Sequence, residues 1–170
     1  MLTVAAVLML VAVGAYWNSF NVPFLLDDAL AIDNNPSIRH LGRIGDVLLP
    51  PPTAPTTARP LLNLTFALNY TEGGLSVRGY HAVNLLIHIC AGLVLLGIVR
   101  RSLLLPGLRP RYGEAALPLA ACVALLWTLH PLQTESVTYI SQRAESLMGL
   151  FYLLTLYCFI RADVGRDRRT

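Results

Sequence analysis

The amino-acid sequence predicts an all-α membrane protein that crosses the bilayer several times. Three observations support this fold class: long apolar segments, few charges, and arginines gathered at the ends of those segments. Hydrophobic residues make up 55% of the 170-residue chain and charged residues only 14%, which is too apolar for an ordinary soluble domain. The bilayer is therefore the expected solvent for much of the chain.

Four apolar segments have about the length that crosses hydrocarbon as a helix, roughly 20 residues. They cover residues 2–20, 80–99, 115–129 and 141–160, and the third is the shortest. The first has the length of a signal peptide, but it lacks a basic start and an Ala-x-Ala cleavage site. Tyr16 and Trp17 near its end are typical interfacial anchors, so we predict an uncleaved span.

Arginine placement predicts the orientation, because basic residues accumulate in cytoplasmic loops. All 13 basic residues are arginine, and two groups of them lie in the short loop 100–114 and the tail 161–170. We predict that this loop and this tail are cytoplasmic and that residues 21–79 and 130–140 lie on the other side. The clustering indicates orientation rather than nucleic-acid binding.

The long outer loop, residues 21–79, has two distinct parts. Residues 48–60 read LLPPPTAPTTARP, and this proline-rich composition predicts an extended, semi-rigid spacer without helix. Residues 61–70 read LLNLTFALNY, which is too short to span and predicts an interfacial helix. We find no internal repeat, and residues 1–170 are predicted to form a single membrane-embedded unit.

An acidic pair, Asp27 and Asp28, follows the first span within a few residues. Adjacent carboxylates repel each other, which favours a basic or protonated form of one of them, and such a group acts as a general base or a metal ligand. The alternative is a solvated pair that ends the span or caps a helix over DDALAI.

Two arginines, Arg59 and Arg78, lie on the predicted outer side, where the orientation rule does not favour cations. A guanidinium binds phosphate oxygens bidentately, so either residue suits a lipid-linked phosphate. The alternative is snorkelling to lipid headgroups or pairing with a nearby aspartate.

A polar stripe on the second span consists of His81, Asn84 and His88, which share one helix face at spacings of three and four. The two histidines are about 10 Å apart on a straight helix, too far to bind one metal ion directly. Packing and inter-helix hydrogen bonding are the favoured interpretation. The cysteines Cys90, Cys122 and Cys158 lie within apolar runs and predict neither a disulfide framework nor a zinc site.

Ionisable side chains gather again where the chain approaches the fourth span: His130, Glu135, Arg143 and Glu145. One interpretation is an ion pair between Glu135 and Arg143 that braces the loop. The other is a contribution to binding a charged headgroup, and the residues do not decide between them.

Four segments, FLLDDALAIDNNPSIR, RPLLNLTFALNY, GYHAVNLLIH and LHPLQTESVTYISQRAESL, occur in this order and cover nearly the whole chain. Together they resemble the N-terminal membrane region of transmembrane and tetratricopeptide repeat containing proteins. That family is similar to protein O-mannosyltransferases and to the GT-C glycosyltransferases, which have many spans and an acidic motif in their first outer loop. The family carries further spans and then tetratricopeptide repeats, so the resemblance implies the N-terminal part of such an enzyme.

The resemblance implies transfer of a sugar, mannose in this family, from a polyprenyl-phosphate donor to protein Ser or Thr hydroxyls. Asp27 or Asp28 would be the general base. The implied substrate-binding residues are Arg59, His81, His130, Glu135, Arg143 and Glu145. No metal ligand or cofactor is assigned. The partners are the lipid-linked sugar, an acceptor protein and membrane lipid, without nucleic acid.

The implied location is the inner membrane of a bacterium, with outer loops in the periplasm, or the endoplasmic reticulum membrane of a eukaryote. The alternative function is a non-catalytic anchor, an assembly module or part of a transporter. Transporters more often show Gly or Pro breaks in mid-span, and the second span contains only Gly92 and Gly97, which favours the enzyme.

Overall fold

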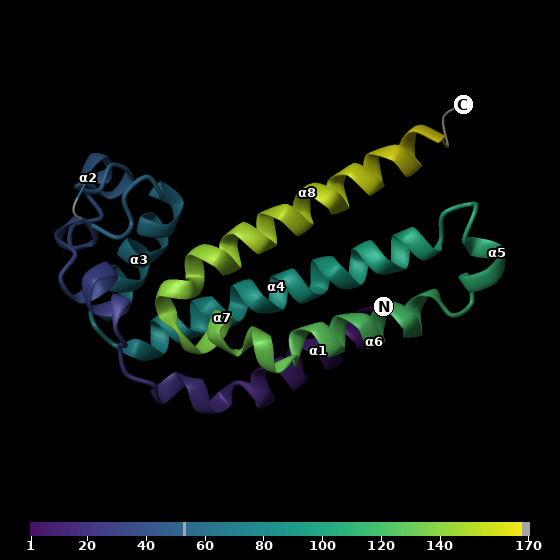
Figure 1. Ribbon diagram of the computed structural model, residues 1–170, viewed down its shortest axis with the longest axis horizontal. Helices are drawn as coiled ribbons and strands as arrows, with labels where there is room; N and C mark the ends of the chain where they lie inside the picture. Colours follow the sequence, from purple (N-terminus) through teal and green to yellow (C-terminus); the bar gives the residue numbers. More distant parts are fainter. Residues whose placement is uncertain (53, 168–170) are drawn as a thin grey trace. The chain divides into compact units, whose positions relative to one another are not determined.

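The structure is a computed structural model that describes residues 1–52 and 54–167, with side chains described up to residue 162. All regular elements in these residues are helical, which confirms the all-α prediction (Figure 1). The longer helices are α1 (Leu2–Ala15), α3 (Pro60–Gly73), α4 (Val77–Leu103), α6 (Ala116–Thr128) and α8 (Arg143–Asp167). The short ones are η1 (Trp17–Asn21), η2 (Ala29–Asp33), η3 (Pro36–Ile38), α2 (Ile44–Leu48), α5 (Arg109–Tyr112), η4 (Pro131–Gln133), α7 (Thr134–Thr138) and η5 (Ile140–Gln142).

The chain divides into two compact units. The first, which we call the bundle unit, contains Met1–Ala15, Leu86–Gln133 and Met148–Thr170, of which residues 168–170 lie outside the described part. The second, the loop unit, contains Tyr16–Leu85 and Thr134–Leu147. Helices α4 and α8 each contribute residues to both units.

Two helices are long and apolar enough to cross a membrane, which supports an integral membrane protein. They are Val77–Leu103 and Ile140–Ala162, and they contain the predicted spans 80–99 and 141–160. A third candidate is a bent pair, Ala116–Thr128 with Pro131–Thr138, whose axes differ by 57°. Helix α1 has 14 residues, about 21 Å, and ends five residues before the predicted boundary at residue 20, where η1 follows. The count of four spans stays a prediction.

Small residues allow close helix packing in the bundle unit. Leu8 of α1 packs with Ala120 and Ala124 of α6, and all three side chains are fully buried. A Cβ atom on Gly92 of α4 would lie 2.6 Å from the Thr128 hydroxyl oxygen, so only glycine permits this approach. Glycine and alanine at helix contacts are typical of membrane proteins, where tight packing replaces the hydrophobic effect between helices.

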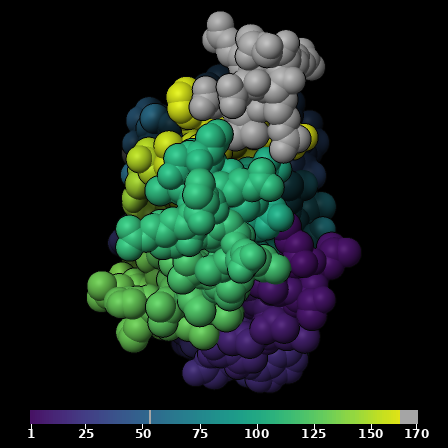
Figure 2. All heavy atoms as spheres, turned by 90° about the vertical axis from the view of Figure 1, so that its right-hand side faces the viewer, coloured from purple at the N-terminus to yellow at the C-terminus, as the bar shows by residue number. Residues whose placement is uncertain are grey.

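The four arginines of the predicted cytoplasmic loop lie at the end of α4 and in the connection between α4 and α6, and Figure 2 looks onto this connection. Arg101 lies over the ring of Tyr157, 5.1 Å from its centre, and Arg111 lies 5.2 Å from the ring centre of Tyr112. Such cation–π contacts hold guanidinium groups beside aromatic rings at the end of the unit. The cytoplasmic location of this loop stays a prediction.

The loop unit has an apolar core under its short helices. Ile38 of η3, Val47 of α2 and Phe66 of α3 are fully buried together with Ile32 and Tyr80. Helix α3 begins at Pro60, whose fixed φ suits a first helical turn, and it is followed by Gly74 at φ +59°. The predicted helix at 61–70 therefore forms, with a buried face that contributes to this core.

The proline-rich segment is not the extended spacer that its composition predicts. The backbone N–H groups of Ala54, Thr57 and Arg59 each donate to the carbonyl three residues earlier, at 2.9–3.0 Å, so the segment folds into consecutive turns. The Thr57 hydroxyl reinforces them through the Pro51 carbonyl at 2.7 Å. The prediction of an extended conformation is wrong because threonine hydroxyls and tertiary contacts supply bonds that polyproline II lacks.

A buried polar cluster of Asn35, Ser37, Thr56 and Asn63 attaches these turns to the rest of the loop unit. The Asn63 amide donates to the Ser37 hydroxyl at 2.9 Å and to the Val47 carbonyl at 2.7 Å, while its oxygen accepts from Thr56 at 2.9 Å and Asn35 at 3.0 Å. All four residues are at most 6% exposed. Because buried polar groups are costly when unpaired, this closed set fixes the path of the chain toward residue 59.

Candidate active site

The two aspartates of the acidic pair have different surroundings. Asp28 is 1% exposed, and its Oδ1 accepts hydrogen bonds from the Ser141 backbone N–H at 2.7 Å and from the Ser141 hydroxyl. Its Oδ2 accepts from the Leu25 N–H at 3.0 Å. The residue stands at the N-cap position of η2 but makes no side-chain cap bond, so the predicted helix cap is not its role. Its carboxylate instead joins the acidic pair to the segment that enters α8.

Asp27 is exposed, and its backbone N–H donates to the Tyr139 hydroxyl at 3.3 Å. Its carboxylate also interacts with that hydroxyl, through its charge and a side-chain hydrogen bond. This side chain lines a cavity of about 170 Å³ in the loop unit. Of the two aspartates, Asp27 is therefore the one that is exposed at the cavity, whereas Asp28 is buried.

The cavity gathers charged and polar side chains from four separate stretches of the loop unit. The charged ones are Asp27, Arg59 and Glu145, and all three are exposed. Tyr139, Ser141 and Gln142 add polar groups, and Leu62 and Phe66 of α3 add apolar surface. A carboxylate and a guanidinium in one small cavity suit a ligand that presents both a hydroxyl and a phosphate.

Backbone strain occurs beside both Asp27 and Arg59. Within the described part of the chain, two residues other than glycine have positive φ: Leu26 at +40° and Ala58 at +61°. Each directly precedes one of the charged residues of the cavity. A left-handed conformation costs a residue with a Cβ about 1–2 kcal/mol, and such strain concentrates at functional sites.

Burial raises the pKa of the Tyr139 phenol, and the negative charge of Asp27 adds to the increase. The hydroxyl therefore stays protonated throughout the neutral range. While its oxygen accepts from the Asp27 N–H, its own proton is able to donate to a carboxylate or a ligand in the cavity. The sequence reasoning did not select Tyr139, although it stands in the segment TYISQR that leads to the fourth span.

Arg143 is fully buried at the start of α8 and does not line the cavity. Its Nε donates to the Asn84 oxygen at 2.7 Å, its Nη1 to the Asn69 oxygen at 2.8 Å and to the Thr65 hydroxyl at 3.1 Å. Its Nη2 donates to the Tyr80 carbonyl at 2.8 Å. These neutral acceptors use hydrogen-bond donors on all three nitrogens of the guanidinium.

The ion pair predicted between Glu135 and Arg143 is not formed among the described residues, so that interpretation is wrong. The physical reason is that α3 and α4 supply enough oxygen acceptors to satisfy the buried cation, while Glu135 on α7 is exposed. Neither residue is brought into the cavity.

The remaining predicted site residues lie elsewhere. His81 is fully buried in the loop unit, with Nδ1 3.2 Å from the Val137 carbonyl oxygen and Nε2 2.9 Å from that of Val22. His130 is an exposed residue of the bundle unit whose Nδ1 accepts from the Leu132 N–H at 3.2 Å. The cavity thus unites Asp27, Arg59 and Glu145, and it contains neither of these histidines.

The polar stripe on α4 packs as the sequence predicts. His88 stacks on Trp127, with ring centres 5.0 Å apart, and its Nε2 lies 2.9 Å from the Thr128 carbonyl oxygen. The Asn84 side-chain oxygen accepts the hydrogen bond from Arg143 Nε. Cys90, Cys122 and Cys158 are free thiols, and the described residues contain no cluster of three His, Cys, Asp or Glu side chains placed to hold a metal ion.

Comparison with known proteins identifies relatives along most of the chain. It is 33% identical over 165 residues to the protein O-mannosyl-transferase TMTC4 of Homo sapiens, a match that covers 89% of this chain and 22% of that protein. It is 31% identical over 154 residues to tmtc2 of Xenopus laevis, with 86% and 17% covered, and 31% identical over 160 residues to Tmtc1 of Drosophila melanogaster, with 89% and 17% covered.

No protein-family model matches the sequence, and no solved structure matches the chain. The curated relatives confirm the resemblance that the sequence motifs indicate. The chain is a homologue of the TMTC protein O-mannosyl-transferases over a stretch equal to 17–22% of the length of these relatives.

Proposed function

We propose that the chain is the N-terminal part of a membrane glycosyltransferase that moves a sugar, mannose by homology, from a polyprenyl-phosphate donor to protein Ser or Thr hydroxyls. The observation that carries this proposal is the cavity in which Asp27 and Arg59 lie together. The relatives are protein O-mannosyl-transferases, which supports the reaction class. Because the chain spans about a fifth of their length, the rest of the catalytic cavity is assigned to other parts of such an enzyme.

The proposed chemistry is a single displacement with inversion at the anomeric carbon. The acceptor hydroxyl oxygen attacks that carbon while its proton passes to the Asp27 carboxylate. The bond between the anomeric carbon and the phosphate oxygen breaks, and polyprenyl phosphate leaves with the electron pair. Arg59 stabilises the negative charge on the departing phosphate.

The other residues of the site have supporting roles in this proposal. Asp28 fixes the backbone of the acidic pair through Ser141 and is a positioning residue. Glu145, in the first turn of α8, accepts hydrogen bonds from sugar hydroxyls. Arg143, in place of the headgroup role suggested by its motif, holds α3, α4 and α8 together behind the cavity.

The proposed site faces away from the cytoplasm, because the arginine clusters assign the α4–α6 connection to the cytoplasmic side. In a eukaryote the membrane is that of the endoplasmic reticulum, and in a bacterium it is the inner membrane. In both cases the polyprenyl-phosphate sugar is presented on the side where the Asp27 cavity opens.

The test is sugar transfer by the complete reading frame in liposomes, with polyprenyl-phosphate mannose as donor and glycopeptides detected by mass spectrometry. Asp27→Asn is expected to abolish transfer. The matched control is Asp33→Asn, which removes the same charge from η2 at an exposed position outside the cavity and should leave transfer unchanged. Wild-type transfer rates in Asp27→Asn would overturn the proposed role of Asp27.

A further inference from the structure

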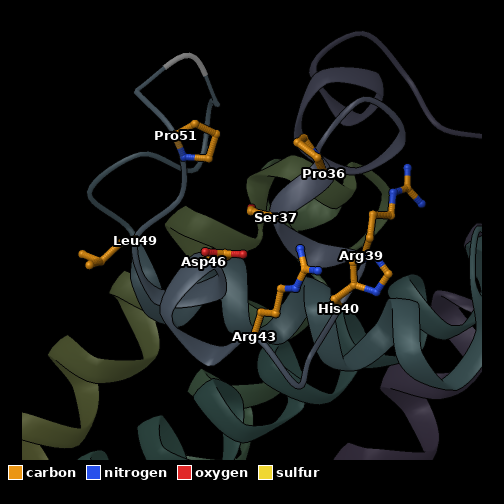
Figure 3. Close-up of a pocket in the computed structure, with 8 residues that line it drawn as sticks. All are labelled: Pro36, Ser37, Arg39, His40, Arg43, Asp46, Leu49 and Pro51. Atoms are coloured by element: carbon orange, nitrogen blue, oxygen red, sulfur yellow. The ribbon is translucent and has the colours of Figure 1, made fainter.

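A larger cavity, of about 490 Å³, lies in the loop unit outside the candidate active site. It is formed by η3, α2 and the residues that follow each of them. Arg39, His40 and Arg43 line one side of it, and Leu49 and Pro51 lie on the opposite side (Figure 3). The two sides therefore differ in chemistry: one is cationic, and the other is apolar apart from Asp46.

The cationic side combines one fixed charge with two unengaged side chains. The Arg39 guanidinium lies 4.2 Å from the ring centre of Tyr70, and its Nη2 donates to the carbonyls of Ile32, at 3.2 Å, and Asp33. In the described part of the chain, the side chains of His40 and Arg43 make no hydrogen bond or ion pair. Figure 3 shows the Arg43 guanidinium pointing into the cavity. These two side chains are available to an anionic ligand.

The apolar side continues onto an exposed surface of α2. Leu49 is 81% exposed, Ile44 is 51% exposed and Leu48 is 37% exposed. Val47, which lies between them in sequence, is fully buried in the core, so α2 places some apolar residues inward and others outward. Exposed apolar residues beside cations are the pattern of a segment that rests on a membrane surface.

The balance of charge favours an anion. Two arginines carry permanent positive charges at the cavity, and Asp46 on α2 contributes one negative charge. The negative charge of Asp46 weakens the attraction for an anion. Removing this charge should therefore strengthen anion binding, whereas removing an arginine should weaken it. A phosphodiester suits the net charge because it carries one negative charge and several acceptor oxygens.

We propose that this cavity binds the phosphodiester of a membrane phospholipid headgroup. Arg43 and His40 donate to the phosphate oxygens, and Leu49 and Ile44 contact the upper part of the acyl chains. A free phosphate ion would use only the cationic side, whereas a phospholipid uses both. The bound lipid would attach the loop unit to the bilayer surface, and this role does not depend on the proposed sugar transfer.

The test uses the full chain in a neutral detergent, titrated with dihexanoyl-phosphatidylglycerol. The readout is the NMR signal of each histidine ring, assigned by single His→Gln variants of the four histidines. We expect a saturable shift at His40 and an unmoved His130 in the bundle unit. Arg43→Gln should weaken binding by about tenfold, and Asp46→Asn should strengthen it.

Three further arms identify the ligand. Inorganic phosphate should bind at least about tenfold more weakly than the lipid, and Leu49→Ser should weaken lipid binding without changing phosphate binding. A short isoprenyl phosphate should compete less well than the phospholipid, because a phosphomonoester with one chain matches the net charge and the apolar side of the cavity less closely. Equal affinity for inorganic phosphate would make this a plain anion site, and tighter binding of the isoprenyl phosphate than of the phospholipid would make it a donor site. Either result, or no shift at His40 in a folded chain, overturns the proposal.

Discussion

The Asp28 carboxylate accepts two hydrogen bonds from Ser141, a residue 113 positions later in the chain, with the backbone N–H at 2.7 Å. This contact joins the start of the first outer loop to the start of α8. It also gives the two aspartates different roles. The Asp28 carboxylate holds the two segments together, whereas the Asp27 side chain lines the cavity.

Asp28→Asn should lower the free energy of unfolding of the loop unit by about 1–3 kcal/mol, because the new NH₂ group faces either the Leu25 N–H or the two Ser141 donors. The measurement is the thermal unfolding midpoint in detergent, followed by circular dichroism. Asp27→Asn, at an exposed position, is the matched control and should leave the midpoint unchanged. A midpoint unaffected by Asp28→Asn would contradict the structural role.

Arg143→Lys should be strongly destabilising although it keeps the charge. A lysine ammonium cannot reach Asn84, Asn69, Thr65 and the Tyr80 carbonyl together, and buried acceptors lose their donors. We expect a loss of about 3 kcal/mol or more, since breaking a buried charged network is among the costliest substitutions. Limited proteolysis of the loop unit measures this loss of stability.

Arg161→Lys, an exposed change on the same helix α8, is the control for this experiment and should not alter proteolysis. Equal protease resistance of Arg143→Lys and wild type would show that the guanidinium geometry is not needed for packing. In that case a direct role in binding the donor would again be the better interpretation of Arg143.

The fold class was predictable from the sequence, because long apolar runs and sparse charge leave helices as the expected form. The helix boundaries were less predictable. The α-helix α1 covers only Leu2–Ala15, and the short helix η1 follows it at the interfacial residues Tyr16 and Trp17. The proline-rich segment was predicted wrongly, since its turns depend on Thr56 and Asn63, which meet only through tertiary contacts.

Ala58→Gly should stabilise the loop unit by about 0.5–1 kcal/mol, because glycine adopts φ +61° without the steric cost that alanine carries. Ala58→Val should destabilise it by about 1–2 kcal/mol, since a β-branched residue is still less suited to this region. Urea unfolding of both variants gives the comparison. If Ala58→Gly lowered the stability, the positive φ of residue 58 would not be a source of strain.

Arg59→Gln should weaken binding of the polyprenyl-phosphate donor by about 10–100-fold, the equivalent of about 1.5–3 kcal/mol for a hydrogen bond to a charged group. Arg59→Lys should retain part of the affinity, as a point charge without the planar fork. Binding of a fluorescent donor analogue measures both. Arg109→Gln, outside this cavity on α5, is the charge-matched control, and a similar loss there would point to nonspecific attraction.

The candidate site was only partly predictable from the sequence. Asp27, Arg59 and Glu145 were selected through their charge and motifs, and the structure places all three at one cavity. Sequence reasoning did not separate Asp27 from Asp28, because their difference comes from the distant Ser141. It also did not select Tyr139, whose hydroxyl is significant only through its contact with Asp27.

In the proposed mechanism, Asp27 is the base of the transfer reaction and does not bind the donor. The most direct test measures kcat at saturating donor, and donor affinity separately, for Asp27→Asn in the complete reading frame. We expect a kcat lower by about 10²-fold or more, typical of a lost general base, with donor affinity within about threefold of wild type. An unchanged kcat, or a loss explained entirely by weaker donor binding, would contradict it.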